Sequence, residues 1–342
     1  MAILLGVDTG GTYTDAVLMR DEDVVLASAK SLTTRHDLAE GVGSAVAAVL
    51  ASSGIAPQDV SLASLSTTLA TNALVEGQGA RVALVYIGFA ERDLTAQGLQ
   101  DALAGDPVLL TQGGHTHDGS EAATLNTTGI VDWAKAQDVS AFAIAAQFGT
   151  RNPAHEVAAR DAVRAATGKP VTCSHELSAK LGGPKRALTA VLNARLIGVT
   201  HRLIGRAERA LRDLGIDAPL MVVRGDGALM SADQAQERPI ETILSGPAAS
   251  IVGARWLTSA DHALVSDIGG TTTDIALLEN GRPVIDPDGA RVGPHRTMVE
   301  AVAMRTYGLG GDSEVHISDE GLEAQVTLRS EEHTSELQSL TN

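Results

Sequence analysis

Two short stretches of this chain carry aspartate, glycine and threonine in the same order. The first runs from Asp8 to Asp15 (DTGGTYTD) and the second from Asp267 to Asp274 (DIGGTTTD), and each lies between two apolar runs. Each stretch therefore predicts a β-hairpin with a Gly-Gly turn. Glycine permits positive φ angles, which allow a tight turn, and without a side chain its N–H group can approach an anion closely.

The residue types in both stretches favour a site for phosphate and a metal ion. Threonine hydroxyls can donate to phosphate oxygens, whereas a carboxylate beside phosphate is repelled unless a cation lies between them. Mg²⁺ takes one or two carboxylates together with waters and phosphate oxygens, so we expect Asp8 and Asp267 to hold Mg²⁺ or to orient the attacking oxygen. The residues expected to bind the nucleotide are Thr9, Gly10, Gly11, Thr12, Thr14, Gly269, Gly270, Thr271, Thr272 and Thr273. Two ordinary hairpins are the alternative, which the match at both aspartates, both glycines and two threonines disfavours.

Composition indicates a folded, acidic protein. A length of 342 residues favours two domains, and 44% apolar with 20% charged residues supports a packed core. The net charge of −16, without a basic stripe, argues against binding nucleic acid. No apolar run reaches the roughly 18 residues of a membrane span, and no basic leader precedes the first strand, so we expect a cytoplasmic protein without membrane contact. Cys173 is the only cysteine, which fits a reducing compartment.

Strand and helix patterns alternate along the chain, which predicts a layered α/β fold. We expect strands within residues 2–30 and at 62–66, 81–87, 141–146, 171–174 and 220–224, and helices at 37–52, 67–76, 131–136, 153–167 and 248–256. A long helix is predicted from about residue 183 to residue 214, after the boundary marked by Gly182 to Pro184. Residues 105–128, rich in glycine, threonine, aspartate and histidine, are expected to be irregular.

The paired stretches resemble the two phosphate-binding hairpins of the actin, sugar kinase and Hsp70 ATPase superfamily. More narrowly, the chain resembles the hydantoinase A/5-oxoprolinase family. The matching segments, in the family's order, are 6–15, 66–77 (STTLATNALVEG), 151–156 (RNPAHE), 174–177 (SHEL), 245–250 (SGPAAS), 267–274 and 308–313 (GLGGDS). Two departures bear on substrate identity: Leu65-Ser66 replaces the His-Gly of many members, and Asp312 replaces a third glycine.

This resemblance implies an α/β fold of two ribonuclease-H-like, actin-like ATPase lobes with a nucleotide cleft between them. Residues 1–182 would form the first lobe and residues 183–329 the second. Residues 330–342 (SEEHTSELQSLTN) resemble translated sequencing-adapter read-through. Because family members are longer, we expect this tail to be non-native and the second lobe to be incomplete.

The resemblance also implies an ATP-dependent hydrolase that uses Mg²⁺ and opens a cyclic amide, such as a hydantoin or 5-oxoproline, by phosphorylating its carbonyl oxygen. The expected catalytic residues are Asp8, Asp267, Asp15 and Asp274, of which the last two are candidates for directing water. We expect Gly310 and Gly311 at the adenine or ribose, and Thr71 and Asn72 at the substrate or a phosphate. A second hydantoinase-type subunit is the expected protein partner.

Two other functions fit the same residues. A subunit of an ATP-dependent, acetone-carboxylase-like enzyme would phosphorylate an enolate or bicarbonate. A nucleotide-gated binding protein would have no enzymatic activity at all, because fold alone does not settle function.

Three smaller patterns each have an ordinary alternative. His115, His117 and Asp118 have metal-ligand types but are spaced as in a solvated turn. His175-Glu176 is a candidate acid/base pair or an ordinary strand end. Ser245 is a candidate helix cap.

Overall fold

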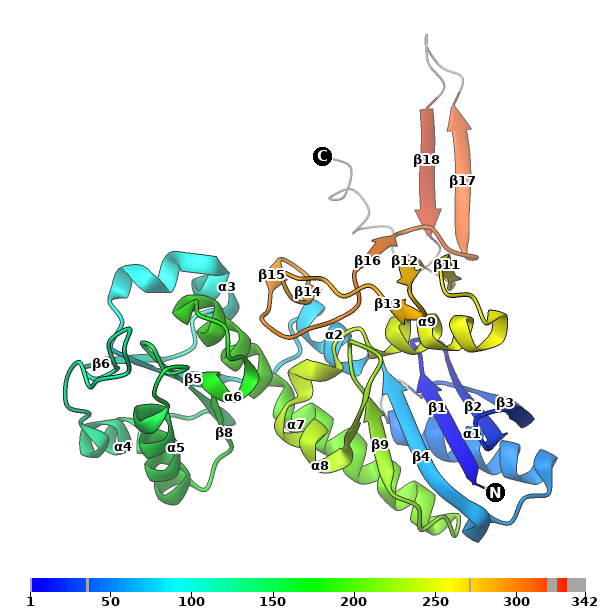
Figure 1. Ribbon diagram of the computed structural model, residues 1–342, viewed down its shortest axis with the longest axis horizontal. Helices are drawn as coiled ribbons and strands as arrows, with labels where there is room; N and C mark the ends of the chain where they lie inside the picture. Colours follow the sequence, from blue (N-terminus) through cyan, green and yellow to red (C-terminus); the bar gives the residue numbers. More distant parts are fainter. Residues whose placement is uncertain (1, 35–36, 271, 319–324, 331–342) are drawn as a thin grey trace.

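A six-stranded mixed sheet forms the first part of the computed structural model, which describes residues 2–34, 37–270, 272–318 and 325–330 (Figure 1). Its strands are β1 (Ile3–Thr9), β2 (Tyr13–Arg20), β3 (Val24–Leu32), β4 (Val60–Thr67), β9 (Leu220–Val223) and β10 (Leu229–Ser231), in the order β10-β9-β4-β1-β2-β3. β1, β2 and β3 form an antiparallel meander, whereas β4 pairs parallel to β1, and β9 pairs parallel to β4. This is the ribonuclease-H-like arrangement.

Alternation along β1 explains which face of this sheet is covered. Every second residue from Ile3 to Thr9 is buried, and those between are partly exposed, as expected for a strand with one face on a core. The buried face packs on α1 (Leu38–Ser53), which Asp37 caps by accepting the Ala39 N–H at 3.3 Å and Gly54 ends in a left-handed conformation.

A second sheet is inserted between β4 and β9. Its strands β5 (Val82–Ile87), β6 (Val108–Thr111), β7 (Ala141–Ala146) and β8 (Val171–Cys173) are all parallel, in the order β6-β5-β7-β8. All residues of β5 and β7 are buried, because α4 (Thr127–Lys135) and α5 (Ala154–Thr167) cover one face while α7 (Gly183–Asp213) covers the other. We call residues 82–177 the inserted unit.

The helix α7 belongs to two cores. Residues from Ala187 to Leu196 pack on the inserted unit, and residues from Leu203 to Leu211 pack on the six-stranded sheet. Shorter elements complete this part: η1 (Pro57–Asp59), α2 (Leu69–Val75), η2 (Glu91–Gly98), α3 (Leu99–Leu103), α6 (Ser174–Leu177), α8 (Ala232–Glu237) and η3 (Pro239–Thr242).

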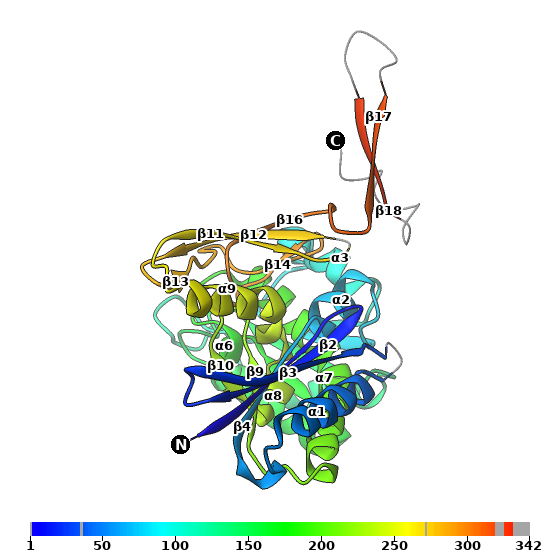
Figure 2. The same cartoon turned by 90° about the vertical axis from the view of Figure 1, so that its right-hand side faces the viewer.

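A third sheet follows α9 (Ser245–Thr258). It contains β11 (Ala263–Ile268), β12 (Thr273–Glu279), β13 (Arg282–Pro283) and β16 (Met304–Tyr307), with β12 paired to the other three. α9 lies between this sheet and the six-stranded sheet and contacts strands of both (Figure 2). β14 (Arg291–Val292) pairs with β15 (His295–Arg296), and β17 (Ser313–Ser318) with β18 (Gln325–Ser330) in a hairpin that projects from the body.

The alternating pattern of the sequence is confirmed as an α/β fold, and α1, β5, β7 and α7 lie close to their predicted bounds. The prediction that residues 105–128 are irregular is wrong at β6, a short, partly exposed strand. The predicted lobe boundary after residue 182 coincides with the start of α7, but the six-stranded sheet takes strands from both sides of it. The predicted foreign tail, residues 330–342, lies outside the described residues except for Ser330.

Candidate nucleotide-binding site

The two motif stretches form hairpins of the same register. In the first, Asp8 pairs with Asp15 across β1 and β2, and in the second Asp267 pairs with Asp274 across β11 and β12. The turns also agree. The Gly10 N–H donates to the carbonyl three residues on at 3.0 Å, and the equivalent bond from Gly269 measures 2.9 Å.

Close approach, and not backbone angle, explains Gly10, Gly269 and Gly270, whereas a Cβ on Gly11 would meet nothing within 4 Å. Gly10, Gly11, Gly269 and Gly270 are all absent from the described glycines with positive φ, so that part of the sequence argument is wrong. A Cβ on Gly10 would lie 3.1 Å from the Tyr13 carbonyl oxygen, and one on Gly269 would lie 3.3 Å from that of Thr272. A side chain would therefore crowd the turn. Gly11 and Thr12 are exposed at the tip, and Thr271 lies outside the described residues.

Carboxylates from the two hairpins lie close enough to interact. Burial raises the pKa of Asp8, and the neighbouring charges of Asp15 and Asp267 raise it further, while the Ser66 hydroxyl lowers it. Burial also raises the pKa of Asp274, with Asp267 adding to the effect. These shared charge interactions place the two motifs together. Asp8 belongs to the first sheet and Asp267 to the third, and 259 positions separate them in sequence.

Two other segments meet at Asp8. The Ser66 hydroxyl donates to Asp8 Oδ1. Beside it, Ser245 Oγ accepts the Thr67 N–H at 3.2 Å and donates to the Thr67 carbonyl at 2.9 Å. Ser245 therefore joins α9 to the end of β4. It does not cap the helix, whose N-cap residue is Leu244 in a left-handed conformation. A Cβ on Gly246 would lie 3.9 Å from Asp8 Oδ1, so small residues keep α9 near that carboxylate.

Sequence reasoning missed two residues of β3 and the loop after it that support the first hairpin. Thr33 Oγ1 donates to the Gly10 carbonyl at 3.0 Å, and lies 3.0 Å from the buried Thr14 hydroxyl. Lys30 Nζ lies 3.2 Å from Asp15 Oδ1. From the sequence, only the placing of Lys30 opposite Asp15 on neighbouring strands could have indicated this contact. Thr9 Oγ1 is buried without a hydrogen-bond partner among the described residues.

The glycine-rich segment after β16 lies against the second hairpin. The Gly311 N–H donates to the Gly269 carbonyl at 2.9 Å, and the Asp312 N–H donates to the Gly270 carbonyl at 2.8 Å. Gly310 is held by its N–H bond to Ser313 Oγ at 2.9 Å. Thr272 and Thr273 also belong to this hairpin, where Thr273 Oγ1 donates to the Leu309 carbonyl at 2.5 Å. The adenine or ribose contact of Gly310 and Gly311 stays a prediction.

The two residues predicted to contact substrate lie on α2. Thr71 Oγ1 accepts the Leu244 N–H at 3.3 Å, which places α2 beside the start of α9. Asn72 is exposed and its Nδ2 donates to Thr68 Oγ1 at 3.3 Å. Their role in binding substrate stays a prediction.

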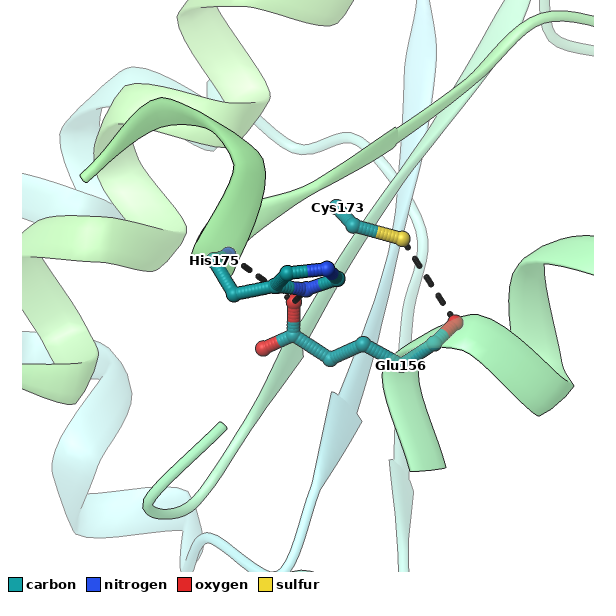
Figure 3. A group of neighbouring side chains, drawn as sticks. All are labelled: Glu156, Cys173 and His175. Atoms are coloured by element: carbon teal, nitrogen blue, oxygen red, sulfur yellow. Dashed lines mark hydrogen bonds and ion pairs between the residues drawn. The ribbon is translucent and has the colours of Figure 1, made fainter. Parts of the chain in front are cut away.

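A buried carboxylate, Glu156, joins two of the family segments far from the hairpins. Its Oε1 accepts the Ala146 N–H at 2.8 Å and the Ser174 hydroxyl at 2.7 Å. Its Oε2 accepts the His175 N–H at 3.0 Å and lies 2.7 Å from His175 Nδ1 (Figure 3). Arg186 Nε donates to Ser174 Oγ at 3.3 Å, and Nη2 donates to the Ala146 carbonyl at 3.0 Å. We call this group the Glu156 network.

The Glu156 network is explained without a metal. Glu156, Cys173 and His175 have ligand atoms within 4.8 Å of one another, alone among the described residues. However, Glu156 already accepts four hydrogen bonds, and burial raises the pKa of the Cys173 thiol far above its usual value. Glu176 pairs with Arg160 at 2.7 Å, so His175 and Glu176 do not form an acid/base pair with each other.

The candidate metal ligands near residue 115 lie in and beside a turn, which the sequence spacing favoured over a metal site. Asp118 accepts hydrogen bonds from the Ser120 hydroxyl at 2.6 Å and from the Ser120 N–H at 3.0 Å. His115 is buried and its ring lies against that of His155, with 4.4 Å between the ring centroids and an angle of 40° between the ring planes. In the part of the chain that the structure describes, no helix is both long and apolar enough to span a bilayer.

Comparisons with known proteins cover nearly the whole chain. Residues 4–167 match the hydantoinase/oxoprolinase N-terminal region, and residues 186–340 match the hydantoinase/oxoprolinase domain. The chain is 30% identical to the caprolactamase subunit alpha of Pseudomonas jessenii over 93% of this chain and 49% of that protein. It is 27% identical to the acetophenone carboxylase gamma subunit of Aromatoleum aromaticum, over 95% of this chain and 49% of that protein. The chain thus spans about half the length of these relatives.

Solved structures agree with these sequence matches. The crystal structure of the ATP-dependent caprolactamase from Pseudomonas jessenii superposes with a TM-score of 0.78 at 31% identity, covering 96% of this chain and 51% of that one. A nucleotide-free acetone carboxylase superposes with a TM-score of 0.74 at 22% identity, again over 96% of this chain and 51% of that one, and this similarity is one of fold. Together with the sheet topology, they confirm the predicted α/β fold class of the actin-like ATPases.

Proposed function

The chain belongs to the hydantoinase/oxoprolinase family, and on that premise we propose that it uses ATP to open a cyclic amide of the hydantoin or 5-oxoproline type. The observation that best supports the proposal is the approach of Asp8 and Asp267, carried by two hairpins of equal register from different sheets. The similarity to a caprolactamase, whose name denotes action on a cyclic amide, supports the substrate class.

The carboxylates at the site fit a bound Mg²⁺ ion. Burial and mutual repulsion raise the pKa of Asp8, and a divalent cation would relieve both effects. Asp8 and Asp267 would hold the ion, directly or through water. When bound, it supplies positive charge that neutralises the phosphate oxygens of ATP.

The chain's own residues have distinct tasks in this proposal. The exposed turn positions Gly11 and Gly270 would lie closest to the phosphates, because the Gly10 and Gly269 N–H groups already donate within their turns. The exposed Thr12 offers a hydroxyl beside them. Asp274 is the better of the two candidates for directing water, because its pKa is raised whereas Asp15 is paired with Lys30. A carboxylate with a raised pKa accepts a proton more readily near neutral pH.

Phosphorylation would solve the central difficulty of opening an unstrained amide. Transfer of the terminal phosphoryl group to the carbonyl oxygen forms a new P–O bond and releases ADP. Water then attacks the activated carbon, the carbon–nitrogen bond breaks as the ring nitrogen takes up a proton, and the ring opens to an acyl phosphate. A second water hydrolyses this acyl phosphate to the carboxylate and inorganic phosphate. The hairpins would stabilise charge on the transferred group, which is the main demand of such chemistry.

The test begins with nucleotide binding. Calorimetry with MgATP should give a measurable affinity that Asp8→Asn and Asp267→Asn each weaken at least tenfold. Asp23→Asn, at an exposed aspartate in the β2–β3 turn, serves as the matched control. ADP release is then measured with hydantoin, 5-oxoproline or caprolactam. Equal affinities for all four proteins, or ADP release indifferent to every cyclic amide, would refute the proposal.

A carboxylase role is the second candidate, favoured by the match to an acetophenone carboxylase subunit over 95% of this chain. ADP release that requires a ketone and bicarbonate, and not a cyclic amide, would favour it. Because both relatives are named as subunits, we propose a second polypeptide as partner in either case. Co-purification of the proteins encoded by neighbouring genes is the direct check.

A further inference from the structure

A cavity of about 690 Å³ lies between α5 and α8, and none of the residues predicted to bind the nucleotide lines it. Sites for small molecules usually have volumes of roughly 300–1,000 Å³. Val163 of α5 belongs to the core of the inserted unit, whereas Ala235 of α8 belongs to the core of the six-stranded sheet. We call the cavity the α5–α8 cleft; its lining includes Arg160, Arg164, Ile197, Asp233 and Glu237.

The side of the cleft that joins the two helices is partly apolar. α5 contacts β8, β8 contacts α7, and α7 contacts α8, with α5 in the inserted unit and α8 beside α7 (Figure 1). Ile197 of α7 lines the cleft and belongs to none of the four cores of the described residues. Val171 of β8 lines it as well. A ligand here would therefore meet apolar side chains between the two helices.

The α5 wall has an arginine with free donors. Arg160 is neutralised, because its Nε lies 2.9 Å from Asp161 Oδ1 and its Nη1 lies 2.7 Å from Glu176 Oε1. Arg164, one turn further along α5, donates from Nη2 to the Val171 carbonyl at 2.9 Å. No carboxylate of the described residues pairs with Arg164, so its Nε and Nη1 are available to a ligand. A guanidinium group with two free donors suits a carboxylate.

The α8 wall has two carboxylates without a cation. Asp233 and Glu237 lie four residues apart on α8, and in the described part of the chain neither side chain has a hydrogen bond or an ion pair. Like charges at this spacing destabilise a helix, and Glu237 also lies at the C-terminal end, where the helix dipole disfavours a negative charge. Arg238, which also lines the cleft, pairs with Glu241 at 3.7 Å. A bound cationic group would relieve both effects.

The balance of charge in the lining narrows the class of ligand. The charged side chains, apart from His201, are three arginines and three carboxylates: Arg160, Arg164, Arg238, Glu176, Asp233 and Glu237. A polyanion such as a nucleotide would meet the unpaired carboxylates of α8, and a divalent cation would meet the arginines of α5. A molecule with one charge of each sign, separated by an apolar chain, matches both walls and the apolar side between them.

We propose that the α5–α8 cleft binds an ω-amino acid, with its carboxylate on Arg164 and its ammonium group between Asp233 and Glu237. The methylene chain of the ligand lies along Ile197. The binding site is separate from the nucleotide site and requires no nucleotide. One link rests on the proposed function: opening an unsubstituted lactam ring gives an ω-amino acid, so the cleft would then hold a product of the reaction.

The first experiment measures binding by calorimetry without nucleotide, with 6-aminohexanoate as the probe. Arg164→Gln and Glu237→Gln should each weaken its binding at least about tenfold, because each removes one charge-assisted contact. Hexanoate and hexylamine, which each carry one of the two charges, should bind the unaltered chain at least about tenfold more weakly. Arg212→Gln is the matched control, because Arg212 is exposed in the last turn of α7 as Arg164 is in that of α5, and it should leave the affinity unchanged.

The second experiment measures thermal unfolding with and without 6-aminohexanoate. A ligand that binds the folded chain raises the melting temperature, so the shift should appear in the unaltered chain and in Arg212→Gln and be reduced in Glu237→Gln. Arg164→Lys keeps the positive charge and should bind the probe more tightly than Arg164→Gln. If Arg164→Gln does not fold, Arg164→Lys and Glu237→Gln still decide the matter.

Three outcomes would overturn the proposal. The first is a folded protein that gives neither heat nor a melting shift with 6-aminohexanoate. The second is equal affinity in the unaltered chain, Arg164→Gln and Glu237→Gln, which would place any binding elsewhere. The third is equal affinity for 6-aminohexanoate and hexanoate, which would leave the ammonium group without a role. Neither ATP nor a cyclic amide is present in these assays, so their failure is distinct from failure of the proposed function.

Discussion

The Glu156 network gives the sharpest prediction about stability. Glu156→Ala removes the acceptor of four hydrogen bonds, two of them from backbone N–H groups, and leaves those donors buried. It also removes the negative charge near Arg186, which is 1% exposed. Hydrogen bonds to a charged group contribute about 1.5–3 kcal/mol each but do not add, and breaking a buried charge network costs about 3–5 kcal/mol.

We therefore expect Glu156→Ala to lower the free energy of unfolding by about 3–5 kcal/mol, a large part of the roughly 5–15 kcal/mol typical of a protein. Glu156→Gln keeps one oxygen but turns an amide NH₂ group toward the donors, so it should cost about 2–3 kcal/mol. Trp133 lies on α4, beside the core that α5 and β8 share. Its fluorescence in a Trp256→Phe background reports unfolding of the inserted unit in urea.

The control for this prediction is Glu91→Gln, at an exposed glutamate of η2. It should change the free energy of unfolding by less than about 0.5 kcal/mol. The reasoning is wrong if Glu156→Ala and Glu156→Gln both match this control. It is also wrong if Glu156→Gln costs as much as Glu156→Ala, because the retained oxygen would then contribute nothing.

Two further predictions concern the candidate site and its supports. Because the pKa of Asp8 is raised in the folded chain, the ligand-free protein should lose stability as pH rises from the ordinary value of 3.8 through the raised one. Asp8→Asn should flatten this part of the pH profile, measured by thermal unfolding without nucleotide. An unchanged slope would show that the pKa of Asp8 is not raised in the folded chain. Gly225→Ala would place a Cβ 2.1 Å from the Ile243 carbonyl oxygen, so we expect a loss of more than about 2 kcal/mol. Gly253→Ala on α9 meets nothing within 4 Å and should stabilise by about 0.5–1 kcal/mol; similar urea midpoints for the two variants would contradict this pair.

Local patterns in the sequence predicted much of the fold. The motif stretches specified their hairpins because strand, turn and strand are adjacent in the chain, and the helical spacing after residue 183 specified α7. The uniformly apolar runs at β5 and β7 matched strands covered on both faces. These predictions rest on interactions between near neighbours, which a single sequence records directly.

What the sequence did not reveal depends on which segments meet. Glu156 lies in RNPAHE, and its partners Ser174 and His175 lie in SHEL, and no spacing rule connects them. Thr33 supports the first hairpin only because β3 returns beside β2. The turn glycines were predicted for their φ angles, but at Gly10 and Gly269 the structure needs a glycine for space. A pattern can identify a glycine without revealing what approaches it.

The shared helix α7 has a consequence for how the molecule can lose its structure. Its 31 residues correspond to a rod of about 46 Å at 1.5 Å per residue. Seven of its buried apolar residues belong to the core of the inserted unit and four to the core of the six-stranded sheet. The helical turns between Leu196 and Leu203 connect the two cores without a break. If either core unfolds, its part of α7 unfolds with it, and the other core no longer has a complete helix. Heat should therefore produce one calorimetric peak for both sheets, and a destabilised inserted unit should weaken the hairpin that carries Asp8.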